Sequence, residues 1–292
     1  MQPSTQLRAF PPAKTNRPVV MKRRRTSRQW LVIALLIAGC IFTVGPFLAI
    51  LILALSPEGA PSIPYSWPER LTLDNLARVL GTQNFTTWTM NSLIYSIVSV
   101  MVILLTASMA GYSFAKKRFP GRDAIMWSFL ATLMVPVQVT LIPLFVLIAS
   151  LDGVNTYWGL IVPTLANSQA VFLMRQFIQG LPDDLFEAAR IDGAGEWTIF
   201  FRIVLPLMKP ILATLGIFVF LWHWNDFLWP LVIAQTDAMR TLTVGLASMN
   251  AETVYRSSLM AAAVISVIPC LIIFAVLQRY LVNSVAMTGI KG

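Results

Sequence analysis

The chain has little charge, little cysteine and a single histidine. Of its 292 residues, 12% are charged and 57% are hydrophobic, whereas about a quarter of a soluble protein is charged. This balance excludes a water-soluble enzyme and a disordered protein. Cys40 and Cys270 both lie in apolar runs, which excludes a disulfide framework, and with one histidine they supply no set of metal ligands. The composition indicates a polytopic membrane protein.

Long stretches without charge define the expected membrane spans. A helix needs about 20 apolar residues to cross the hydrocarbon core, and five charge-free stretches reach this length, as does a sixth that contains His223 and Asp226. We therefore expect an all-α polytopic membrane protein with six transmembrane helices, near 30–55, 91–115, 124–150, 154–175, 211–235 and 257–280. Prolines inside these stretches favour kinks, at Pro46, Pro136, Pro143, Pro163, Pro230 and Pro269.

The ends of the chain differ from this transmembrane domain, which we place at 30–282. Residues 1–29 form a basic tail, and its first 20 residues contain four prolines and are expected to be disordered; Met21 is an alternative start. The first apolar run is too long for a signal peptide, and Pro57 would block cleavage after it. We expect an uncleaved first helix, and a short tail at 283–292.

Lysine and arginine predict the orientation of the chain. Eighteen of them fall in the two tails, in the 116–123 loop and in the 175–210 segment, and four fall on the other side of the expected spans. Positively charged loops are cytoplasmic, so both termini are expected in the cytoplasm. The basic tail then needs anionic lipid as its partner and no nucleic acid.

The long cytoplasmic loop at 179–209 has the most specific pattern. Pro182 suits the first turn of a helix, Asp184 and Glu187 have the spacing of a capping box, and Gly193 is a natural stop. We expect a short amphipathic helix, a bend, and a second helix that leads through Leu205-Pro206 into the fifth span. Its alanine side chains are small, so the helix can fit into a groove of another protein.

Glu187-Ala188-Ala189, followed by Gly193 and then by 203–206, resembles the EAA motif of bacterial ABC importer permeases. Further segments are similar to the carbohydrate-uptake branch of that family, at 155–163, 172–177, 188–194 and 224–231. The last five residues resemble the tail of the maltose-type second permease. The resemblance covers roughly 30–292.

This resemblance implies a type I ABC importer permease fold in which the loop helix docks into a cytoplasmic ATPase as a coupling helix. The residues implied for this contact are Glu187, Ala188, Ala189, Asp192, Gly193, Ile203, Leu205 and Pro206. It also implies that the tail inserts between the ATPase subunits, through Thr288, Gly289, Lys291 and Gly292.

The implied partners are a homologous second permease, two copies of an ATPase subunit and an extracytoplasmic binding protein, in the inner membrane of a prokaryote. The chain has no G-x-x-x-x-G-K-[ST] phosphate loop. It is therefore expected to be non-catalytic and to hold no cofactor, while ATP and Mg²⁺ are used by the separate ATPase subunit.

Polar residues at membrane depth are costly and often functional. The candidates for a translocation pathway are Asn91, Gln138, Asn167, Gln169, Trp224, Asn225 and Asp226. Asp226 has two interpretations: a carboxylate that binds sugar hydroxyls or gates the pathway, or a structural carboxylate bonded to backbone or to Asn225. Both stay open.

The expected function is that of a permease subunit of an ATP-driven importer for a sugar, an oligosaccharide or a related polyol or sugar phosphate, working by alternating access. The alternative is an ion-coupled secondary transporter. It would need buried acids in several spans and an internal repeat, whereas Asp226 is the only buried acid expected here.

Overall fold

The computed structural model describes residues 27–57, 70–251 and 256–288 of the chain, without the side chains of 27–29, 83, 250, 251 and 279–288. By its internal contacts, the chain divides into two units, residues 1–47 and residues 48–292. Across the described ranges the secondary structure consists of helices and turns, without a strand. The expectation of an all-α protein is confirmed.

Helix α1, Ser27–Ala54, begins in the first unit and ends in the second. It is a run of apolar residues that continues through Pro46. Between Trp30 and Ala54 its mean hydropathy is 2.6, and its side chains are exposed along almost the whole length. Such a helix suits lipid, because a hydrophobic surface of this kind is unfavourable in water.

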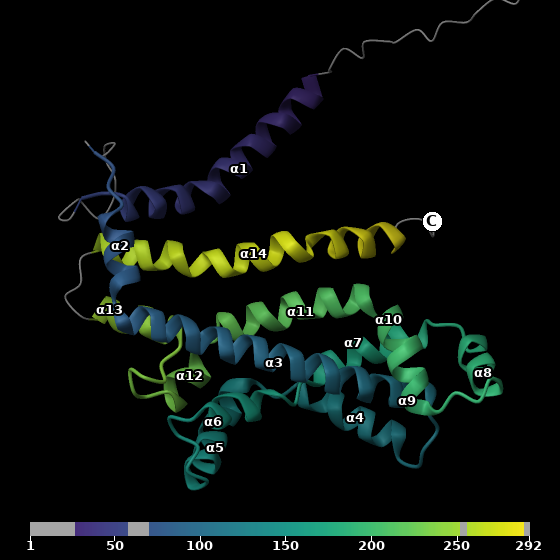
Figure 1. Ribbon diagram of the computed structural model, residues 1–292. Coiled ribbons are helices and arrows are strands. Elements are labelled where there is room, and N and C mark those ends of the chain that lie inside the picture. Colours follow the sequence, from purple (N-terminus) through teal and green to yellow (C-terminus); the bar gives the residue numbers. More distant parts are fainter. Residues whose placement is uncertain (1–26, 58–69, 252–255, 289–292) are drawn as a thin grey trace, which may run out of the picture. The chain divides into compact units, whose positions relative to one another are not determined.

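The second unit contains the remaining helices (Figure 1). In chain order they are α2 Asp74–Gly81, α3 Gln83–Lys116, α4 Arg122–Thr132, α5 Val137–Ser150, α6 Tyr157–Ile161, the 3₁₀-helix η1 Val162–Thr164, α7 Ser168–Gln179, α8 Asp184–Ile191, α9 Glu196–Ile199, the π-helix η2 Phe200–Val204, α10 Leu205–Leu207, α11 Lys209–Trp224, α12 Leu228–Ile233, α13 Leu242–Ala251 and α14 Arg256–Thr288.

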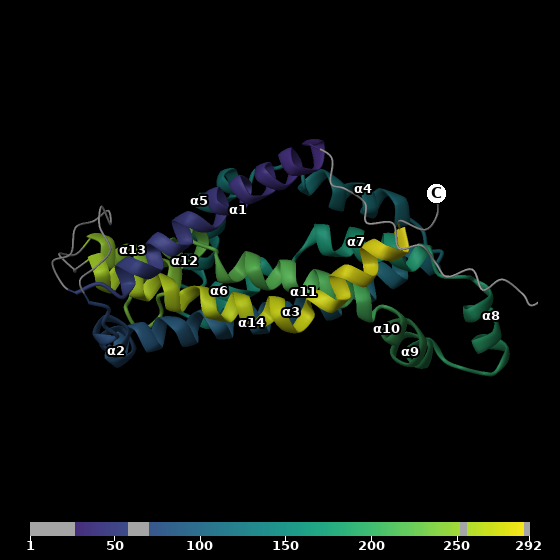
Figure 2. The same cartoon turned by 90° about the horizontal axis from the view of Figure 1, so that it is seen from above.

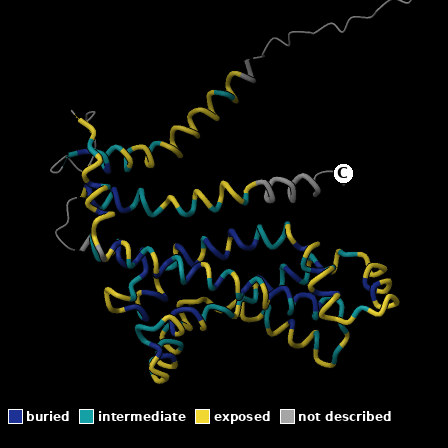
Figure 3. The backbone as a smooth tube through the Cα atoms, in the orientation of Figure 1, coloured by how far each residue is buried: buried dark blue, intermediate teal, exposed yellow. Residues whose placement is uncertain are grey.

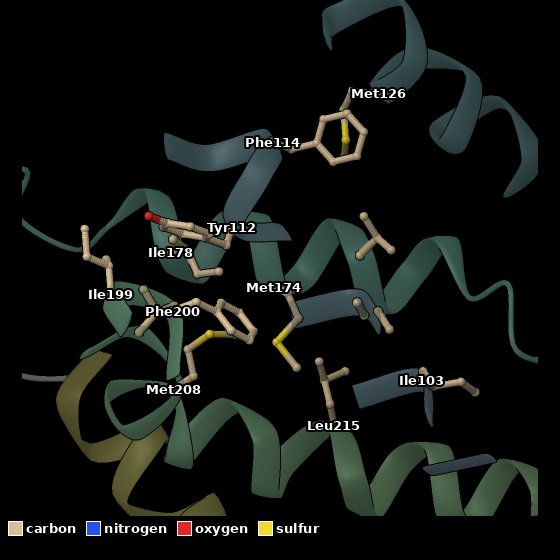
Figure 4. Packing of buried hydrophobic residues seen from close by; sticks show 14 of the residues in the cluster. Ile103, Tyr112, Phe114, Met126, Met174, Ile178, Ile199, Phe200, Met208 and Leu215 are labelled. Atoms are coloured by element: carbon tan, nitrogen blue, oxygen red, sulfur yellow. The ribbon is translucent and has the colours of Figure 1, made fainter. Parts of the chain in front are cut away.

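Helix α3 is the centre of this unit. It packs most extensively on α7 and also on α11, and α11 packs on α14 (Figures 1 and 2). The core next to α7 joins residues from α3, α7, η2 and α11, and Figure 4 shows their side chains pointing toward one another. Burial of this core is the main contribution that holds the α8 half of the unit together.

Glycine allows α3 and α7 to approach closely. A Cβ atom at Gly111 would lie 2.7 Å from the Cβ of Met174 and 2.9 Å from the backbone nitrogen of Arg175. Small residues at helix contacts are typical of membrane proteins, since packing rather than the hydrophobic effect drives association there.

Three of the expected spans are interrupted. The span expected at 124–150 consists of α4 and α5, which meet at 101° across the segment that ends at Pro136. The span expected at 154–175 consists of α6, η1 and α7, and Asn167 caps α7 by accepting a hydrogen bond from Ala170 N at 2.8 Å. The expectation of continuous helices there differs from the structure.

By length and apolar character, three described helices can each cross a membrane: α1, α3 and α14. The number reaches five if two bent pairs, 122–150 and 196–224, each form one span. The fifth expected span, 211–235, is also divided, because α11 ends at Trp224 and α12 begins at Leu228.

Candidate functional site

The loop at 179–209 connects α7 to α11 and contains α8, which lies at one end of the second unit in both ribbon views (Figures 1 and 2). The expected capping box does not form. The residue before α8 is Asp183, and the structure assigns it no capping hydrogen bond. Its carboxylate instead accepts a hydrogen bond from Lys116 Nζ at 2.6 Å, because the lysine at the end of α3 attracts it away from the helix.

Helix α8 ends at Gly193 as the sequence predicts. Gly193 has φ +78°, Gly193 N donates to Arg190 O at 3.0 Å, and Ala194 N donates to Ala189 O at 2.9 Å. This pair of bonds is the Schellman motif, which needs a residue in the left-handed region. Glycine adopts that conformation without steric cost.

The two alanines of the motif have different surroundings. Phe186 and Ala189 are buried against the chain itself, whereas Glu187 and Ala188 are exposed, as are Asp192 and Gly193. Ile191 is 86% exposed, which is unusual for a large apolar side chain. The exposed face of α8 is defined here as Glu187, Ala188 and Ile191, which are all exposed. Figure 3 shows exposed positions along this end of the second unit.

The chain leaves α8 through a bent helical segment. α9, the π-helix η2 and α10 follow one another, and this segment meets α11 at an angle of 74°. The motif residues Ile203 and Leu205 are partly buried against the α3–α7 core, and Pro206 is exposed in α10. π-helical turns of this kind often occur at functional sites.

Two lysines at the end of α3 hold the loop. Lys116 Nζ donates to Leu181 O at 2.7 Å and to Asp183, and this hydrogen bond holds the pKa of Asp183 below its usual range. Lys117 Nζ pairs with Glu196 at the start of α9, and Tyr112 OH donates to the same carboxylate at 2.8 Å. In the sequence, these lysines indicated only the orientation of the chain in the membrane.

Asp226 lies in the break between α11 and α12. Its Oδ2 accepts a hydrogen bond from Tyr95 OH at 2.9 Å, and its backbone oxygen accepts one from Thr243 Oγ1 at 2.7 Å. His223 lies beside it with its ring 4.9 Å from that of Tyr95, and His223 Nε2 is 3.2 Å from Thr164 Oγ1. Asp226 is thus partnered by Tyr95. The structural interpretation named backbone or Asn225 as its partner, and the side-chain amide of Asn225 donates to Leu221 O instead.

Several expected pathway residues are engaged within the chain. Trp224 is buried, stacks on Phe220, and donates from Nε1 to Ser266 O at 3.1 Å. Asn91 is also buried, and Asn225 donates to Leu221 O while staying exposed. In this conformation Trp224 and Asn91 present no surface to a solute.

Other expected pathway residues remain open to the surface. Gln138 is exposed at the start of α5, and Gln169 is exposed in the first turn of α7. Between the end of α4 and the start of α7, Thr132 Oγ1 lies 2.8 Å from Ser168 Oγ. The ten residues 131–140 around the α4–α5 break are all exposed. Since a broken backbone cannot face lipid, protein or water must cover this surface in the membrane.

The side chains of Asn91 and Asn155 form hydrogen bonds with the loop at 235–240. Asn91 Nδ2 donates to Ala238 O and to Arg240 O, each at 2.9 Å, and Tyr157 OH donates to Asn91 Oδ1 at 2.6 Å. Asn155 Oδ1 accepts from the backbone nitrogens of Gln235 and Thr236 at 2.7 and 2.9 Å. Side chains 235–238 stay exposed, so the loop is an ordered surface at the end of the unit opposite α8.

The proposed tail contact lies almost wholly outside the described residues. Thr288 is the last residue of α14, and Gly289, Lys291 and Gly292 follow it beyond the described part. Within the part that the structure describes, no three His, Cys, Asp or Glu residues are close enough to hold a metal ion.

Tyr95, Thr164 and Glu196 belong to these sites although sequence reasoning did not select them. Tyr95 follows Asn91 by four residues, so the helical period could have placed both on one face of α3. The partners are distant in the sequence, however: Tyr95 and Asp226 are 131 residues apart. No periodicity reports such a contact.

Comparison with known proteins agrees with this arrangement. A family model described as "Binding-protein-dependent transport system inner membrane component" matches residues 103–287. The chain is 42% identical over 229 residues to the arabinooligosaccharides transport system permease protein AraQ of Halalkalibacterium halodurans, covering 77% of this chain and 81% of that protein. It is 34% identical over 259 residues to the diacetylchitobiose uptake system permease protein NgcG of Streptomyces coelicolor, covering 87% and 86%.

A further relative is the sn-glycerol-3-phosphate transport system permease protein UgpE of Yersinia pestis, 37% identical over 198 residues, 66% of this chain and 70% of that protein. The fold is similar to a chain in the crystal structure of a bacterial ABC transporter involved in the import of the acidic polysaccharide alginate. The TM-score is 0.77 at 23% identity, over 88% of this chain and 98% of that one.

These matches confirm the resemblance to ABC importer permeases and the fold that it implies, and they give no support to an ion-coupled secondary transporter. The chain belongs to the family of inner membrane components of binding-protein-dependent transport systems.

Proposed function

We propose that this chain is one of two permease subunits of an ATP-driven importer that carries an oligosaccharide into the cytoplasm. The observation that supports this most is α8, which ends in a glycine-dependent Schellman motif and presents Glu187, Ala188 and Ile191 at its surface. The names of AraQ and NgcG support an oligosaccharide, and that of UgpE extends the class to a sugar-related phosphate.

In this proposal the chain spans the inner membrane with both termini in the cytoplasm. It pairs with a homologous, non-identical permease and with two ATPase subunits, which bind ATP and Mg²⁺. A binding protein docks on the extracytoplasmic side, and one structural relative was crystallised with a "periplasmic protein" that carries alginate pentasaccharide. We assign this docking to the ordered 235–240 loop, and we assign the C-terminal tail, 286–292, to the cleft between the ATPase subunits.

The mechanism is alternating access. ATP-driven closure of the ATPase subunits moves the coupling helices of the two permeases together, and the cavity between the permeases then opens outward. The Schellman turn and the bent 196–207 segment direct this movement toward α11. The exposed breaks next to Gln138 and Gln169 supply polar groups for the pathway.

Uptake in proteoliposomes tests this function. The complex, with the ATPase subunits and the binding protein, is reconstituted with ATP inside or outside, and labelled arabinotriose, diacetylchitobiose and sn-glycerol 3-phosphate are compared. ATP-dependent accumulation of one of the two oligosaccharides is expected. Accumulation of glycerol 3-phosphate alone would refute the oligosaccharide class, and uptake driven by an ion gradient without ATP would refute the importer.

The two alanines of the motif are expected to respond differently to enlargement. Ala188→Trp places a bulky side chain on the exposed face of α8, so the subunit should insert normally while ATPase co-purification and uptake are lost. Ala189→Trp must displace the buried packing around Phe186, with an overpacking cost of about 1–3 kcal/mol, so it should lower the yield of the subunit itself. Normal uptake by Ala188→Trp would contradict the docking role.

Removing the charge of Asp226 is expected to reduce uptake and spare assembly. In Asp226→Asn the amide oxygen can still accept the bond from Tyr95 OH, so complex yield and basal ATP hydrolysis should stay near those of the wild type. Uptake should fall roughly tenfold, since a hydrogen bond to a charged group contributes about 1.5–3 kcal/mol.

Tyr95→Phe is the complementary variant, because it removes the hydrogen bond to Asp226 that Asp226→Asn retains, and it keeps the carboxylate. If Asp226→Asn lowers the yield of the complex as strongly as it lowers uptake, the carboxylate is structural.

A further inference from the structure

Helix α3 is long and continuous. It has 34 residues, which at 1.5 Å per residue gives about 50 Å. Helices α1 and α14 are of similar length but each contains a proline, at Pro46 and Pro269, whereas α3 contains none. Because proline removes a helix hydrogen bond and favours a kink, α3 is the stiffest of the long helices in the described part of the chain.

The cytoplasmic end of α3 holds the segment just before α8. The side chain of Lys116 is only 7% exposed, and its Nζ lies 2.6 Å from Asp183 Oδ1, 2.7 Å from Leu181 O and 4.9 Å from the ring centre of Phe186. Phe186 also stacks on Tyr112 with ring centres 6.1 Å apart. A buried ammonium group with these partners is well fixed, since its three hydrogens need acceptors.

The same end of α3 holds the segment just after α8. Glu196 receives the hydrogen bond from Tyr112 OH and pairs with Lys117, and Arg190 Nε of α8 itself lies 3.6 Å from Glu196 Oε1. Helix α8 is thus fixed to α3 on both flanks. A displacement of α8 must carry the end of α3 with it or break these contacts.

The opposite end of α3 holds the extracytoplasmic loop. Trp88 Nε1 donates to Asp237 O at 3.1 Å, Asn91 donates to two further carbonyls, and Ser92 Oγ accepts from Leu242 N at 2.8 Å. Both ribbon views show α3 running from the α2 and α13 end of the unit to the α9 and α10 end (Figures 1 and 2). One helix therefore fixes both loops.

We propose that α3 transmits movement between the 235–240 loop and α8, with Trp88 and Asn91 as positioning residues at one end and Tyr112 and Lys117 at the other. This rests on the proposed function, in which the binding protein docks at the first loop and the ATPase at α8. Docking outside then biases the position of α8 about 40 Å away, because a single stiff element has both loops bonded to it.

The test measures how far the binding protein stimulates ATP hydrolysis by the complete complex in lipid nanodiscs. The probe is the binding protein of the complex, loaded with arabinotriose or, if uptake shows that sugar, with diacetylchitobiose. Lys117→Gln removes the pair with Glu196, and Trp88→Phe removes one hydrogen bond while keeping an aromatic ring. Each should lower the stimulation about fivefold, as expected for the loss of one net hydrogen bond, and leave basal hydrolysis unchanged.

Matched controls separate the contacts from their surroundings. Arg118→Gln removes a neighbouring positive charge that is exposed and has no partner within the described chain, and Met90→Ala changes an exposed residue of α3 near Trp88. Both should keep the wild-type stimulation within about twofold. A loss in Arg118→Gln equal to that in Lys117→Gln would overturn the inference, because net charge would then explain the effect.

The decisive measurement is the double variant. Distant, independent sites have additive effects, so independence predicts a loss of about 25-fold. Transmission through α3 predicts a loss near that of either single variant, since breaking the connection at one end already disconnects the loops. If Lys117→Gln lowers the yield of the complex, Tyr112→Phe replaces it in the cycle, because it removes only the bond to Glu196.

Different results would overturn the proposed function and the transmission through α3. Additive losses in a complex that the binding protein does stimulate would overturn transmission through α3 alone. A wild-type complex whose ATP hydrolysis does not respond to the binding protein would overturn the proposed function and the transmission together.

Discussion

Replacing Gly193 by valine is expected to abolish uptake while the subunit remains inserted in the membrane. At φ +78° a side chain meets the following carbonyl, which costs roughly 1–2 kcal/mol for an L-residue, and β-branched residues are the least tolerant of this region. The Schellman bonds from Gly193 and Ala194 would be lost, and α8 would lead into the next segment in another direction. Uptake should fall at least about tenfold, the factor that corresponds to 1.4 kcal/mol.

Two glycine variants make this measurement specific. Gly195 is two residues away, has φ −72°, and has open space where a Cβ would be, so Gly195→Ala should leave uptake unchanged. Gly193→Asn should retain part of the activity, since asparagine tolerates the left-handed region better than valine. Equal uptake by Gly193→Val and the wild type would show that the direction of α8 does not matter for coupling.

Enlarging Gly111 is expected to be the most damaging single change to the fold. A Cβ at this position meets both the side chain and the backbone of α7, at 2.7 Å from Met174 Cβ and 3.0 Å from Met174 C. A backbone cannot move aside as a flexible side chain can, so the cost should reach or exceed the roughly 1–3 kcal/mol that is usual for overpacking. Gly111→Ala should lower the thermal unfolding temperature and the yield, and Gly111→Leu should prevent assembly.

Gly216 is the matched control in another helix. A Cβ there would make an ordinary contact, 3.5 Å from Leu104 Cδ1. Gly216→Ala should therefore be neutral or slightly stabilising, because alanine is the better helix former. If Gly111→Ala unfolds at the same temperature as Gly216→Ala, the close approach of α3 and α7 is not required.

The helical character of the chain could be predicted from its charge-free runs, and the stop of α8 from Gly193. The breaks could not. Proline was their visible signal, yet Pro143 lies inside a continuous helix while Pro136 marks a bend of 101°. Whether a helix breaks at a proline depends on which neighbouring groups form hydrogen bonds with the backbone that the break leaves unpaired. Near Pro136, α4 contacts α7 through the hydroxyl groups of Thr132 and Ser168.

The candidate site was predictable only where it lies within one segment. The α8 motif is local, so its spacing could be recognised from the sequence. The role of Asp226 depends on Tyr95. The position of α8 depends on Lys116, which lies 65 and 67 residues before its partners Leu181 and Asp183, and on Lys117, which pairs with Glu196. These contacts follow from the packing of α3. From the sequence alone, the lysines indicated only the membrane orientation of the chain.

The bonds from the end of α3 that follows α2 have a consequence for synthesis of the chain. Ser92 and its partner Leu242 are 150 residues apart, and ribosomes add about 5–20 residues per second, so this end of α3 is made roughly 8–30 s before the residues that it binds. During that interval Asn91 and Trp88 lack their final acceptors at the end of a helix that is long and apolar enough to cross a membrane. An unsatisfied amide is costly in lipid. The insertion machinery therefore has to shelter α3, or leave this end of it in water, until α13 has been released from the ribosome.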